Sequence, residues 1–504
     1  MAFPSPIVLS IVTVTFLISY RVLSNLYFHP LSRFRGPWYC AASSFPLAII
    51  SLRRREPQWL LNLTKQYSHN SDEPIRIAPI LLFFPKPASI KDIYTDPRNN
   101  TKANLYGAGL LGPPHLFSTL KGPDHKALRK ALGGPQWSFG ALKTVWEARI
   151  DEHINLFTSK LLTASRQDDQ PLVLSDRISY FTADIMTLLS FGSPWGYVAN
   201  SRDEHSILKS LRDVLDFLGF AMRFRFIRDT VLESPLAGYL LPSETDPTGY
   251  GFLLGQANKL VTEREAQMSQ AFAPERKDYL HHALSAKING NPLTPAQKRA
   301  HVTLLFQAGT DTVGTAIGCM LRFLLKDPTY LAKAVSEIDA ARKAGYLSSP
   351  VQYEETRAHL PFVVTCIKEG IRLHPPATNL FARVSRDGAT RVGSTVMPEG
   401  AEMTTYAYVV QRDPEVFAPD PEAFRPERWL ESEERCAKMD AASFAWGAGA
   451  RVCLGKDVAM FEMYKLLPEI LRRFEMELVD EGEYIVAGGV AYNRNLVVKV
   501  RERK

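Results

Sequence analysis

The residues before Arg21 carry no charge and are mostly apolar. From Ile7 to Tyr20 the sequence reads IVLSIVTVTFLISY, and flanking apolar residues extend it to about the ~20 residues that cross a bilayer as a helix. The next basic residues are Arg33 and Arg35, so the positive-inside tendency places the following chain in the cytosol. A cleaved secretory signal is the alternative, but a basic start and a small-residue cleavage site are missing. We expect a retained signal anchor over residues 1–24.

Prolines dominate the segment that follows the anchor. Phe28-His29-Pro30-Leu31 and Arg35-Gly36-Pro37-Trp38 restrict the backbone at and before each proline. We therefore expect a stiff, extended connector over residues 25–38. No later linker is long enough to separate two domains, and no internal repeat is present, which predicts one catalytic domain over residues 39–504.

Helical periodicity dominates the rest of the chain. Apolar residues recur at helical spacing over Trp146 to Leu162, Ile178 to Phe191, Thr294 to Leu325 and Val458 to Phe474. Short apolar runs near the amino terminus, Ile75-Arg76-Ile77 and Ile80 to Phe84, are typical of paired strands. The pattern predicts a mainly α fold with a small β component (α+β).

Composition and charge narrow the class of protein. With 45% hydrophobic and 22% charged residues, most of the chain can bury a core. The formal net charge is +7, and the basic residues are spread along the chain. This charge suits an anionic membrane surface or an acidic protein partner. We expect no nucleic-acid partner, because zinc-finger spacing, a basic-leucine register and ribonucleoprotein motifs are all missing.

The cysteines indicate a reducing compartment. They are odd in number and scattered, unlike the paired frameworks of small secreted proteins. They stand at Cys40, Cys319, Cys366, Cys436 and Cys453.

One cysteine lies where a glycine-rich loop meets the last predicted helix, in the stretch WGAGARVCLG from Trp446 to Gly455. Gly447 and Gly449 allow a tight turn whose backbone N–H groups point at sulfur, and Gly455 lacks a side chain where a flat macrocycle would press closest. The helix amino terminus favours the thiolate of Cys453 and is expected to lower its pKa. Such a thiolate is the axial ligand that promotes O–O cleavage at haem iron. An ordinary buried thiol is the alternative.

On these residues the sequence resembles the cytochrome P-450 family of haem-thiolate monooxygenases, and within it the membrane-anchored fungal enzymes of specialised metabolism. The resemblance covers nearly the whole chain. It implies the cytochrome P-450 fold, haem b with iron held by Cys453, and dioxygen as co-substrate, with Gly447 and Gly455 in the cofactor-binding loop. The family's loop usually begins with phenylalanine, and Trp446 stands there in this sequence. This difference concerns the redox potential of the iron and not the identity of Cys453 as its ligand.

A second motif, Ala308-Gly309-Thr310-Asp311-Thr312, lies in the predicted Thr294 to Leu325 helix and matches the family's oxygen-binding helix. A threonine hydroxyl bonded back to the carbonyl of Ala308 would loosen one turn, and Gly309 would leave room for a diatomic ligand. Asp311 beside Thr312 is a proton source, so both are predicted catalytic residues. A solvent-facing polar turn is the alternative. Val313 stands where the family often has threonine or serine, a departure that reshapes the pocket wall.

A third motif pairs Glu369 with Arg372 on one helical face. A surface ion pair, which contributes only about 0–1 kcal/mol, is the default interpretation. Leu373-His374-Pro375-Pro376 and Phe424 to Trp429 follow in the family's order. By that resemblance Glu369, Arg372 and Arg428 form a buried structural triad behind the haem, with a role in stability.

Haem propionates need cationic or hydrogen-bonding partners, ideally arginine. The residues that match the family's positions are His125, Arg129, Arg383 and Arg451. His125 stands where the family commonly has tryptophan, and it lies four residues before Arg129 on one helix face. For each of the four a solvated surface role is the alternative.

The resemblance also implies electrons from NADPH through a flavoprotein, NADPH-cytochrome reductase. Lys126, Lys130 and Lys456 would attract its acidic surface, or serve only solubility. Residues 104–120 and 213–241, with Phe306 and Gln307, would contact a small apolar substrate entering from the membrane, or form core and lid.

We therefore expect a monooxygenase of the endoplasmic reticulum membrane, single-pass, with its catalytic domain facing the cytosol. Its reaction would be hydroxylation, epoxidation or further oxidation of a terpenoid, polyketide or alkaloid intermediate. One alternative is a haem-thiolate isomerase or dehydratase that acts on a peroxide without dioxygen, against which Asp311 and Thr312 argue. The other is a non-catalytic, membrane-tethered haem-binding protein.

Overall fold

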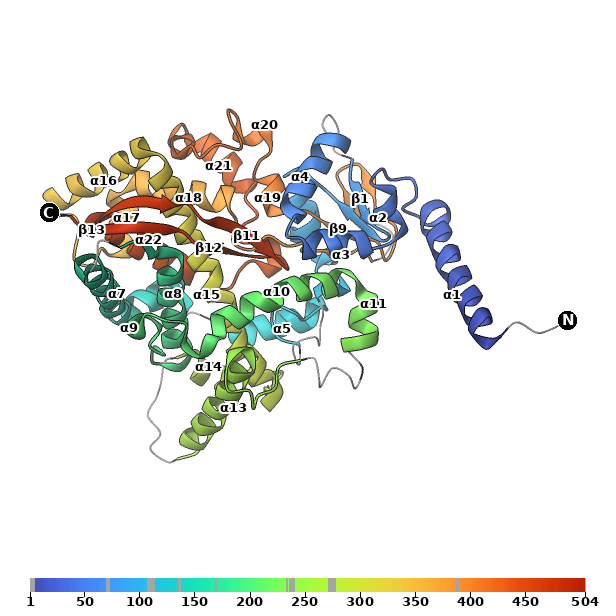
Figure 1. Cartoon of the computed structure of the whole chain (residues 1–504), viewed down its shortest axis with the longest axis horizontal. Helices are drawn as coiled ribbons and strands as arrows, with labels where there is room; N and C mark the ends of the chain where they lie inside the picture. The colour runs from blue at the N-terminus through green and yellow to red at the C-terminus, as the bar shows by residue number, and fades with distance from the viewer. Residues whose placement is uncertain are drawn as a thin grey trace.

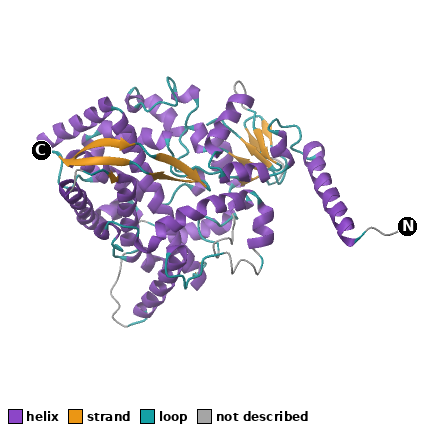
Figure 2. Cartoon of the chain, viewed as in Figure 1, coloured by secondary structure: helices purple, strands orange, loops and turns teal. Residues whose placement is uncertain are grey.

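Helices form most of the chain, with small sheets toward the two ends of the molecule (Figures 1 and 2). The computed structural model describes residues 5–68, 73–106, 114–134, 137–167, 170–232, 234, 241–270, 278–386 and 390–503. The helices are α1 (Pro6–Leu23), α2 (Trp38–Ala42), α3 (Phe45–Leu52), α4 (Glu56–Tyr67), α5 (Gly122–Leu132), α6 (Phe139–Ala141), α7 (Glu147–Gln167), α8 (Leu174–Phe191), α9 (Tyr197–Asn200), α10 (Ile207–Arg223), α11 (Arg225–Ile227), α13 (Gly249–Met268), α14 (Tyr279–Ser285), α15 (Pro295–Lys326), α16 (Pro328–Lys343), α17 (Tyr353–His359), α18 (Pro361–Leu373), α19 (Ala407–Val410), α20 (Pro414–Phe417), α21 (Glu433–Ala441) and α22 (Lys456–Arg473).

The longer strands build three sheets. β1 (Ile75–Ala78), β2 (Leu81–Phe83), β9 (Glu402–Thr404) and β6 (Arg383–Val384) form the first, in the order β1-β2-β9-β6. β10 (Phe474–Asp480), β13 (Val497–Glu502) and β3 (Leu172–Val173) form the second, and β11 (Glu483–Ala487) pairs with β12 (Val490–Arg494). The remaining pairs are β4 (Lys287–Ile288) with β5 (Asn291–Pro292) and β7 (Arg391–Val392) with β8 (Thr395–Val396).

The predicted elements are present with small shifts at their ends. The predicted strands near Ile75 and Phe83 are β1 and β2, which pair antiparallel. The four helices expected from apolar periodicity are α7, α8, α15 and α22. The mainly α fold with a small β component is therefore confirmed.

The amino-terminal helix projects from the rest of the molecule (Figure 1). Pro6–Phe28 is long and apolar enough to cross a membrane, and no residue of α1 is buried. The segment after it differs from the expected extended connector. Ser24–Phe28 continues as a helical turn, Asn25 donates to the carbonyl oxygen of Ala42 at 2.9 Å, and Leu31 is fully buried. The segment therefore packs against the body, because its apolar and amide side chains find partners there.

The longest helix, α15, runs through the middle of the molecule beside α8 (Figure 1). It begins sharply because Thr294 and Gln297 cap each other's backbone N–H and Pro295 occupies its first position. Pro328 opens α16 and keeps the preceding Asp327 out of the helical conformation, so α15 ends there. Its apolar residues, with those of α7, α8, α18 and α22, form the largest core cluster.

Candidate active site

The loop before α22 holds the predicted iron ligand in a tight turn. Gly447 and Gly449 have φ values of +69° and +65°, which L side chains rarely adopt. A Cβ on Gly449 would also lie 2.0 Å from the carbonyl oxygen of Tyr94. The backbone N–H of Cys453 donates to the carbonyl oxygen of Trp446 at 2.8 Å and closes the loop. The glycines are therefore required for the turn, as the sequence predicts.

The sulfur of Cys453 lies in a recess. Cys453 is solvent-accessible, yet enough protein surrounds its sulfur for desolvation to raise the pKa of the thiol above its usual range. The Gly455 N–H and the charges of Arg129 and Lys456 act in the opposite direction without reversing the shift. The expectation of a lowered pKa is therefore wrong for the isolated chain, because burial outweighs the helix terminus. An iron ion at the sulfur would displace the proton.

Open space adjoins both predicted halves of the site. A Cβ on Gly455 would meet no atom within 4 Å. On α15, which contacts α22, Ala308 is exposed and Thr312 is half-buried although both lie in the central helix. A flat cofactor between the loop and α15 needs this kind of free surface on each side.

The second motif adopts the expected hydrogen bond. The Thr312 hydroxyl donates to the carbonyl oxygen of Ala308 at 2.7 Å. Gly309 has a different role from the one expected, because a Cβ there would lie 2.2 Å from the sulfur of Met186 on α8. The missing side chain therefore lets α8 pack against α15, and the expectation that it makes room for a diatomic ligand is wrong.

Asp311 is buried and paired. Its carboxylate accepts hydrogen bonds from Arg212 of α10, at 2.5 Å from Nη2 and 3.1 Å from Nε. Sequence reasoning treated Asp311 as a proton source and did not find this partner. The signal available was the spacing of Leu208, Arg212 and Leu215, which sets an arginine among leucines on one face of the helix.

Buried basic groups gather where the propionates are expected. His125 is 3% exposed and Arg383 is 4% exposed, and the charges of neighbouring basic groups act on His125. Arg451 donates to the carbonyl oxygens of Asn100, Thr119 and Leu120, and Arg129 donates to that of Val452 at 2.6 Å.

Lys102 joins this basic cluster, and sequence reasoning missed it. It pairs with Arg383 in an isolated β-bridge, is 5% exposed, and donates from Nζ to the carbonyl oxygen of Phe117. Its segment has no helical or strand periodicity, so no signal in the sequence shows that its side chain turns inward.

The basic cluster, defined as Lys102, His125, Arg129, Arg383 and Arg451, has no carboxylate hydrogen-bond partner among the described residues. Desolvation and the charges of Arg383 and Arg451 hold the pKa of Lys102 well below its usual range. Desolvation and neighbouring cations lower the pKa of His125 to about 3. Burying cations together without an anion is unfavourable, so this arrangement fits a ligand with two carboxylates. Haem b, with two propionates and an iron that takes an axial thiolate, fits the donor set.

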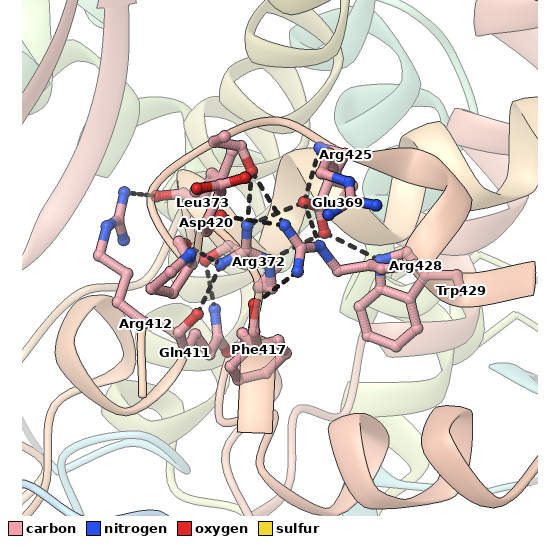
Figure 3. Close-up of polar contacts among 12 residues, drawn as sticks. Glu369, Arg372, Leu373, Gln411, Arg412, Phe417, Asp420, Arg425, Arg428 and Trp429 are labelled. Carbon is pink, nitrogen blue, oxygen red and sulfur yellow. Dashed lines mark hydrogen bonds and ion pairs between the residues drawn. The ribbon is translucent and has the colours of Figure 1, made fainter. Parts of the chain in front are cut away.

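The third motif forms a buried network of charged side chains (Figure 3). Glu369 accepts from Arg372 Nη2 at 2.8 Å and from Arg428 Nε at 2.9 Å, and Trp429 Nε1 donates to its other oxygen at 2.9 Å. The two guanidinium groups also donate to carbonyl oxygens of residues 411, 417, 419, 420, 421 and 423. The predicted triad therefore ties α18 to the loops that precede the cysteine segment.

The remaining predicted residues differ in their exposure to solvent. Lys126, Lys130 and Lys456 are exposed. Phe306 is fully buried, and Gln307 donates to the hydroxyl of Tyr250 at 2.8 Å. Of the expected substrate segments, residues 107–113, 233 and 235–240 lie outside the described residues.

A family profile described as Cytochrome P450 matches residues 94–486, which include every predicted site residue. The chain belongs to the cytochrome P450 family. It is 28% identical over 492 residues to "Cytochrome P450 monooxygenase aba1" of Botryotinia fuckeliana, covering 94% of this chain and 92% of that protein. It is 27% identical over 512 residues to "Cytochrome P450 monooxygenase ABA1" of Pyricularia oryzae, covering 98% and 96%. It is 28% identical over 469 residues to "Cytochrome P450 monooxygenase cicH" of Emericella nidulans, covering 89% of each chain.

These matches identify the chain as a P450 monooxygenase, an oxidoreductase, with fungal relatives of secondary metabolism. The family uses haem with thiolate ligation, dioxygen and an electron donor. The accessible thiol of Cys453 and the basic cluster fit such a cofactor.

Proposed function

We propose that this P450 binds haem b through Cys453 and inserts one atom of dioxygen into a small apolar intermediate of fungal secondary metabolism, a terpenoid, polyketide or alkaloid. NADPH supplies two electrons through a flavoprotein reductase, and the second oxygen atom leaves as water. The observation that carries the proposal is an accessible thiol in a glycine-built loop. The basic cluster, which has no carboxylate hydrogen-bond partner among the described residues, adjoins it.

The predicted site residues would divide the work of cofactor binding, proton supply and support of the loop. Cys453 would be the axial ligand, and Arg129, Arg383, Arg451 and His125 would hold the propionates. Bound haem supplies the activation of dioxygen. Thr312, on the open side of α15, and the buried Asp311 that precedes it in the chain would supply protons. The Thr312 hydroxyl donates to the carbonyl oxygen of Ala308. The triad of Glu369, Arg372 and Arg428 would keep the cysteine loop in place.

The reduced carbonyl complex tests this proposal. The full-length protein is expected to show the strongly red-shifted Soret band of thiolate ligation, and Cys453→Ala is expected to lack it. Cys436→Ala is the matched control, because its partly buried thiol donates to the carbonyl oxygen of Trp429 outside the loop. An unshifted band in the unmodified protein would reject the assignment.

Labelled dioxygen separates oxygen insertion from isomerisation. With reductase, NADPH and a panel of terpenoids, polyketides and alkaloids, one labelled oxygen atom is expected in the product. A product without the label would favour the isomerase or dehydratase, and no product with a thiolate-type spectrum would favour a haem-binding protein.

We also propose that residues 1–24 anchor the enzyme in the endoplasmic reticulum membrane, followed by the segment 25–38 and a cytosolic catalytic domain over 39–504. Exposed Trp38, Phe45 and Phe226 lie on α2, α3 and α11, at the end of the molecule that carries α1 (Figure 1). Aromatic residues favour the membrane interface, which supports this orientation. Carbonate extraction is expected to leave the full chain in the membrane fraction. Release of the full chain would contradict an anchor.

A further inference from the structure

His301 lies on α15 and is fully buried. Its Nδ1 lies 2.7 Å from the carbonyl oxygen of Gln297, four residues earlier on the helix. A carbonyl oxygen can only accept, so Nδ1 carries the proton and Nε2 is left as an acceptor. The backbone N–H of Leu116 donates to this Nε2 at 3.0 Å. The helix therefore fixes the tautomer of the imidazole, and the second nitrogen holds a segment that is distant in sequence.

Residues 115–120 form a compact turn, the 115–120 turn. The carbonyl oxygen of His115 accepts from the backbone N–H of Thr119 at 2.9 Å and from its hydroxyl at 2.7 Å. The N–H of His115 donates to the Ser118 hydroxyl at 3.1 Å, and the N–H of Ser118 donates to His115 Nδ1 at 3.3 Å. The Leu116 side chain packs in the largest core cluster. Because these bonds join the residues of the turn, a contact at Leu116 also positions the others.

The same turn contacts the basic cluster. Lys102 donates from Nζ to the carbonyl oxygen of Phe117, and its backbone N–H donates to the carbonyl oxygen of Leu120 at 3.0 Å. Arg451 donates to the carbonyl oxygens of Thr119 and Leu120, at 2.9 and 2.8 Å. The positions of these two cations therefore depend on the position of the turn.

We propose that His301 is a positioning residue for the cofactor, which holds the 115–120 turn against α15 and so keeps Lys102 and Arg451 in the arrangement that receives the haem propionates. This inference rests on the proposed function, in which the basic cluster binds haem. The acceptor nitrogen is essential, because a Leu116 N–H buried without a partner would be unfavourable. The nitrogen accepts only while His301 is neutral, since a protonated imidazole has two donors and no acceptor.

The surroundings of His301 give the sign of its pH dependence. Burial lowers the pKa of His301 below 6.5, and the hydrogen bond to Gln297 opposes this shift without reversing it. The ring of His115 lies 6.4 Å from that of His301, and burial, with the charges of His301 and Lys102, lowers the pKa of His115 to about 3. The contact of the turn with α15 is thus at full strength above pH 6.5 and weakens as the pH falls below it.

The helices α13 and α14 pack in one cluster with Val302, the residue after His301. On these helices Glu265, Arg264 and His282 have other partners, which are Lys298, Asp278 and the carbonyl oxygen of Leu132. The pKa shift of His301 arises from burial and from Gln297 and not from these charges. His115 and Lys102 are therefore the titratable neighbours that bear on the contact.

The rate of haem transfer from the full-length holoenzyme to excess apomyoglobin tests the proposal. Hydrogen–deuterium exchange of a peptide that contains Leu116 is the second measurement. His301→Leu removes the acceptor, so at pH 7.5 haem loss is expected to be faster by about threefold to tenfold, with faster exchange of the peptide. His301→Gln keeps an acceptor oxygen that does not titrate, so both rates are expected to stay within about twofold of the unmodified enzyme.

Acid pH distinguishes the imidazole nitrogen from the amide oxygen. Between pH 7.5 and pH 5.5, haem loss from the unmodified enzyme is expected to accelerate about fivefold more than haem loss from His301→Gln, because protonation removes the acceptor. His115 titrates in both proteins, so some acceleration remains in His301→Gln. Equal acceleration in the two proteins would overturn the proposal. Haem loss at pH 7.5 that is as fast in His301→Gln as in His301→Leu would also overturn it.

His282→Gln is the matched control. His282 on α14 is partly buried, and burial lowers its pKa too, but its Nε2 donates to the carbonyl oxygen of Leu132 at 3.2 Å. Protonation keeps a donated bond, and glutamine supplies a donor as well. The acid dependence of haem loss from His282→Gln is therefore expected to match that of the unmodified enzyme. A reduction equal to that in His301→Gln would contradict a specific role of His301.

The carbonyl spectrum separates this inference from the proposed function. A thiolate-type band in the unmodified protein, with haem loss that does not differ between it and the His301 variants, rejects only the role of His301. A missing band in the unmodified protein rejects the function itself, and with it the role of His301 toward haem. If His301→Leu does not fold, the comparison of the unmodified enzyme with His301→Gln across pH decides the question.

Discussion

Lys102 donates its buried ammonium group to the carbonyl oxygen of Phe117, and its nitrogen lies 4.4 Å from the centre of the Phe117 ring. Buried Lys465 has a different environment, with Glu147 and Asp151 each 2.8 Å from its nitrogen. Neutralisation by carboxylates explains Lys465 within the chain. Lys102 lacks such a partner among the described residues, and burial holds its pKa well below its usual range. An anion that the chain does not supply would restore its charged form, which indicates an anionic ligand at this place.

We predict that Lys102→Met weakens haem binding. Methionine keeps the packing against the rings but loses a charge-assisted hydrogen bond, so haem loss should be faster by about tenfold, or about 1.4 kcal/mol. The rate is measured by haem transfer to excess apomyoglobin. Lys465→Met is the control and should lower thermal stability while leaving the transfer rate of the folded enzyme unchanged. Equal haem retention in both variants would remove Lys102 from the cofactor site.

We predict that Thr312→Ala diverts electrons. Loss of the hydroxyl that faces the open side of α15 removes a proton donor, so product formed per NADPH should fall by about tenfold or more and peroxide should rise. The ratio of peroxide to NADPH measures this effect. The control is Thr310→Ala, because the Thr310 hydroxyl bonds back to Phe306 at 2.7 Å and is 1% exposed. A ratio that is unchanged in Thr312→Ala would exclude Thr312 from proton supply.

We predict that Glu369→Gln destabilises the fold by about 3–5 kcal/mol, because both guanidinium groups of the triad lose their buried anion. Chemical denaturation of the holoenzyme measures this change. Asp440→Asn is the matched control. It breaks the exposed ion pair, at 3.0 Å, between Asp440 on α21 and Lys368, which lies on α18 beside Glu369. That change should cost at most about 1 kcal/mol. Equal effects of the two substitutions would contradict a buried structural triad.

The same carboxyl group predicts a pH dependence. Burial alone would raise the pKa of Glu369, but the hydrogen bond and charge of Arg372 and the charge of Arg428 lower it below its ordinary 4.5. The stabilisation is therefore present above pH 4.5 and is lost as the pH falls below it. Melting temperatures from pH 7 to pH 3 should show the unmodified enzyme approaching Glu369→Gln at the acid end. A constant difference would contradict the lowered pKa.

We predict that Glu462→Gln becomes increasingly stabilising as the pH rises. Burial raises the pKa of Glu462 well above 4.5, and neither carboxyl oxygen has a hydrogen-bond partner in the described part of the chain. Folding therefore requires proton uptake above pH 4.5, and glutamine removes that requirement. Thermal unfolding at pH 5 and pH 8 measures the difference, which should be larger at pH 8. In the same experiment Glu369→Gln should lower the stability of the protein instead of raising it.

The sequence predicted those features that local chemistry controls. Apolar spacing identified α7, α8, α15 and α22, because a helix needs its buried residues at fixed intervals. The glycines of the cysteine loop and the bond from Thr312 to Ala308 were predictable because both depend on residues a few positions apart.

Other features depend on contacts between distant segments. Gly309 packs against Met186, Arg212 holds Asp311, and Lys102 turns into the basic cluster, and none of these partners is close in sequence. The pKa of the Cys453 thiol also follows from burial by the whole fold and not from its helix alone. The sequence by itself thus determined the helices, the loop that presents the sulfur and the family. Only the tertiary structure decided which charges meet and which stay unpaired, because burial and long-range contacts set the free energy of each charged group.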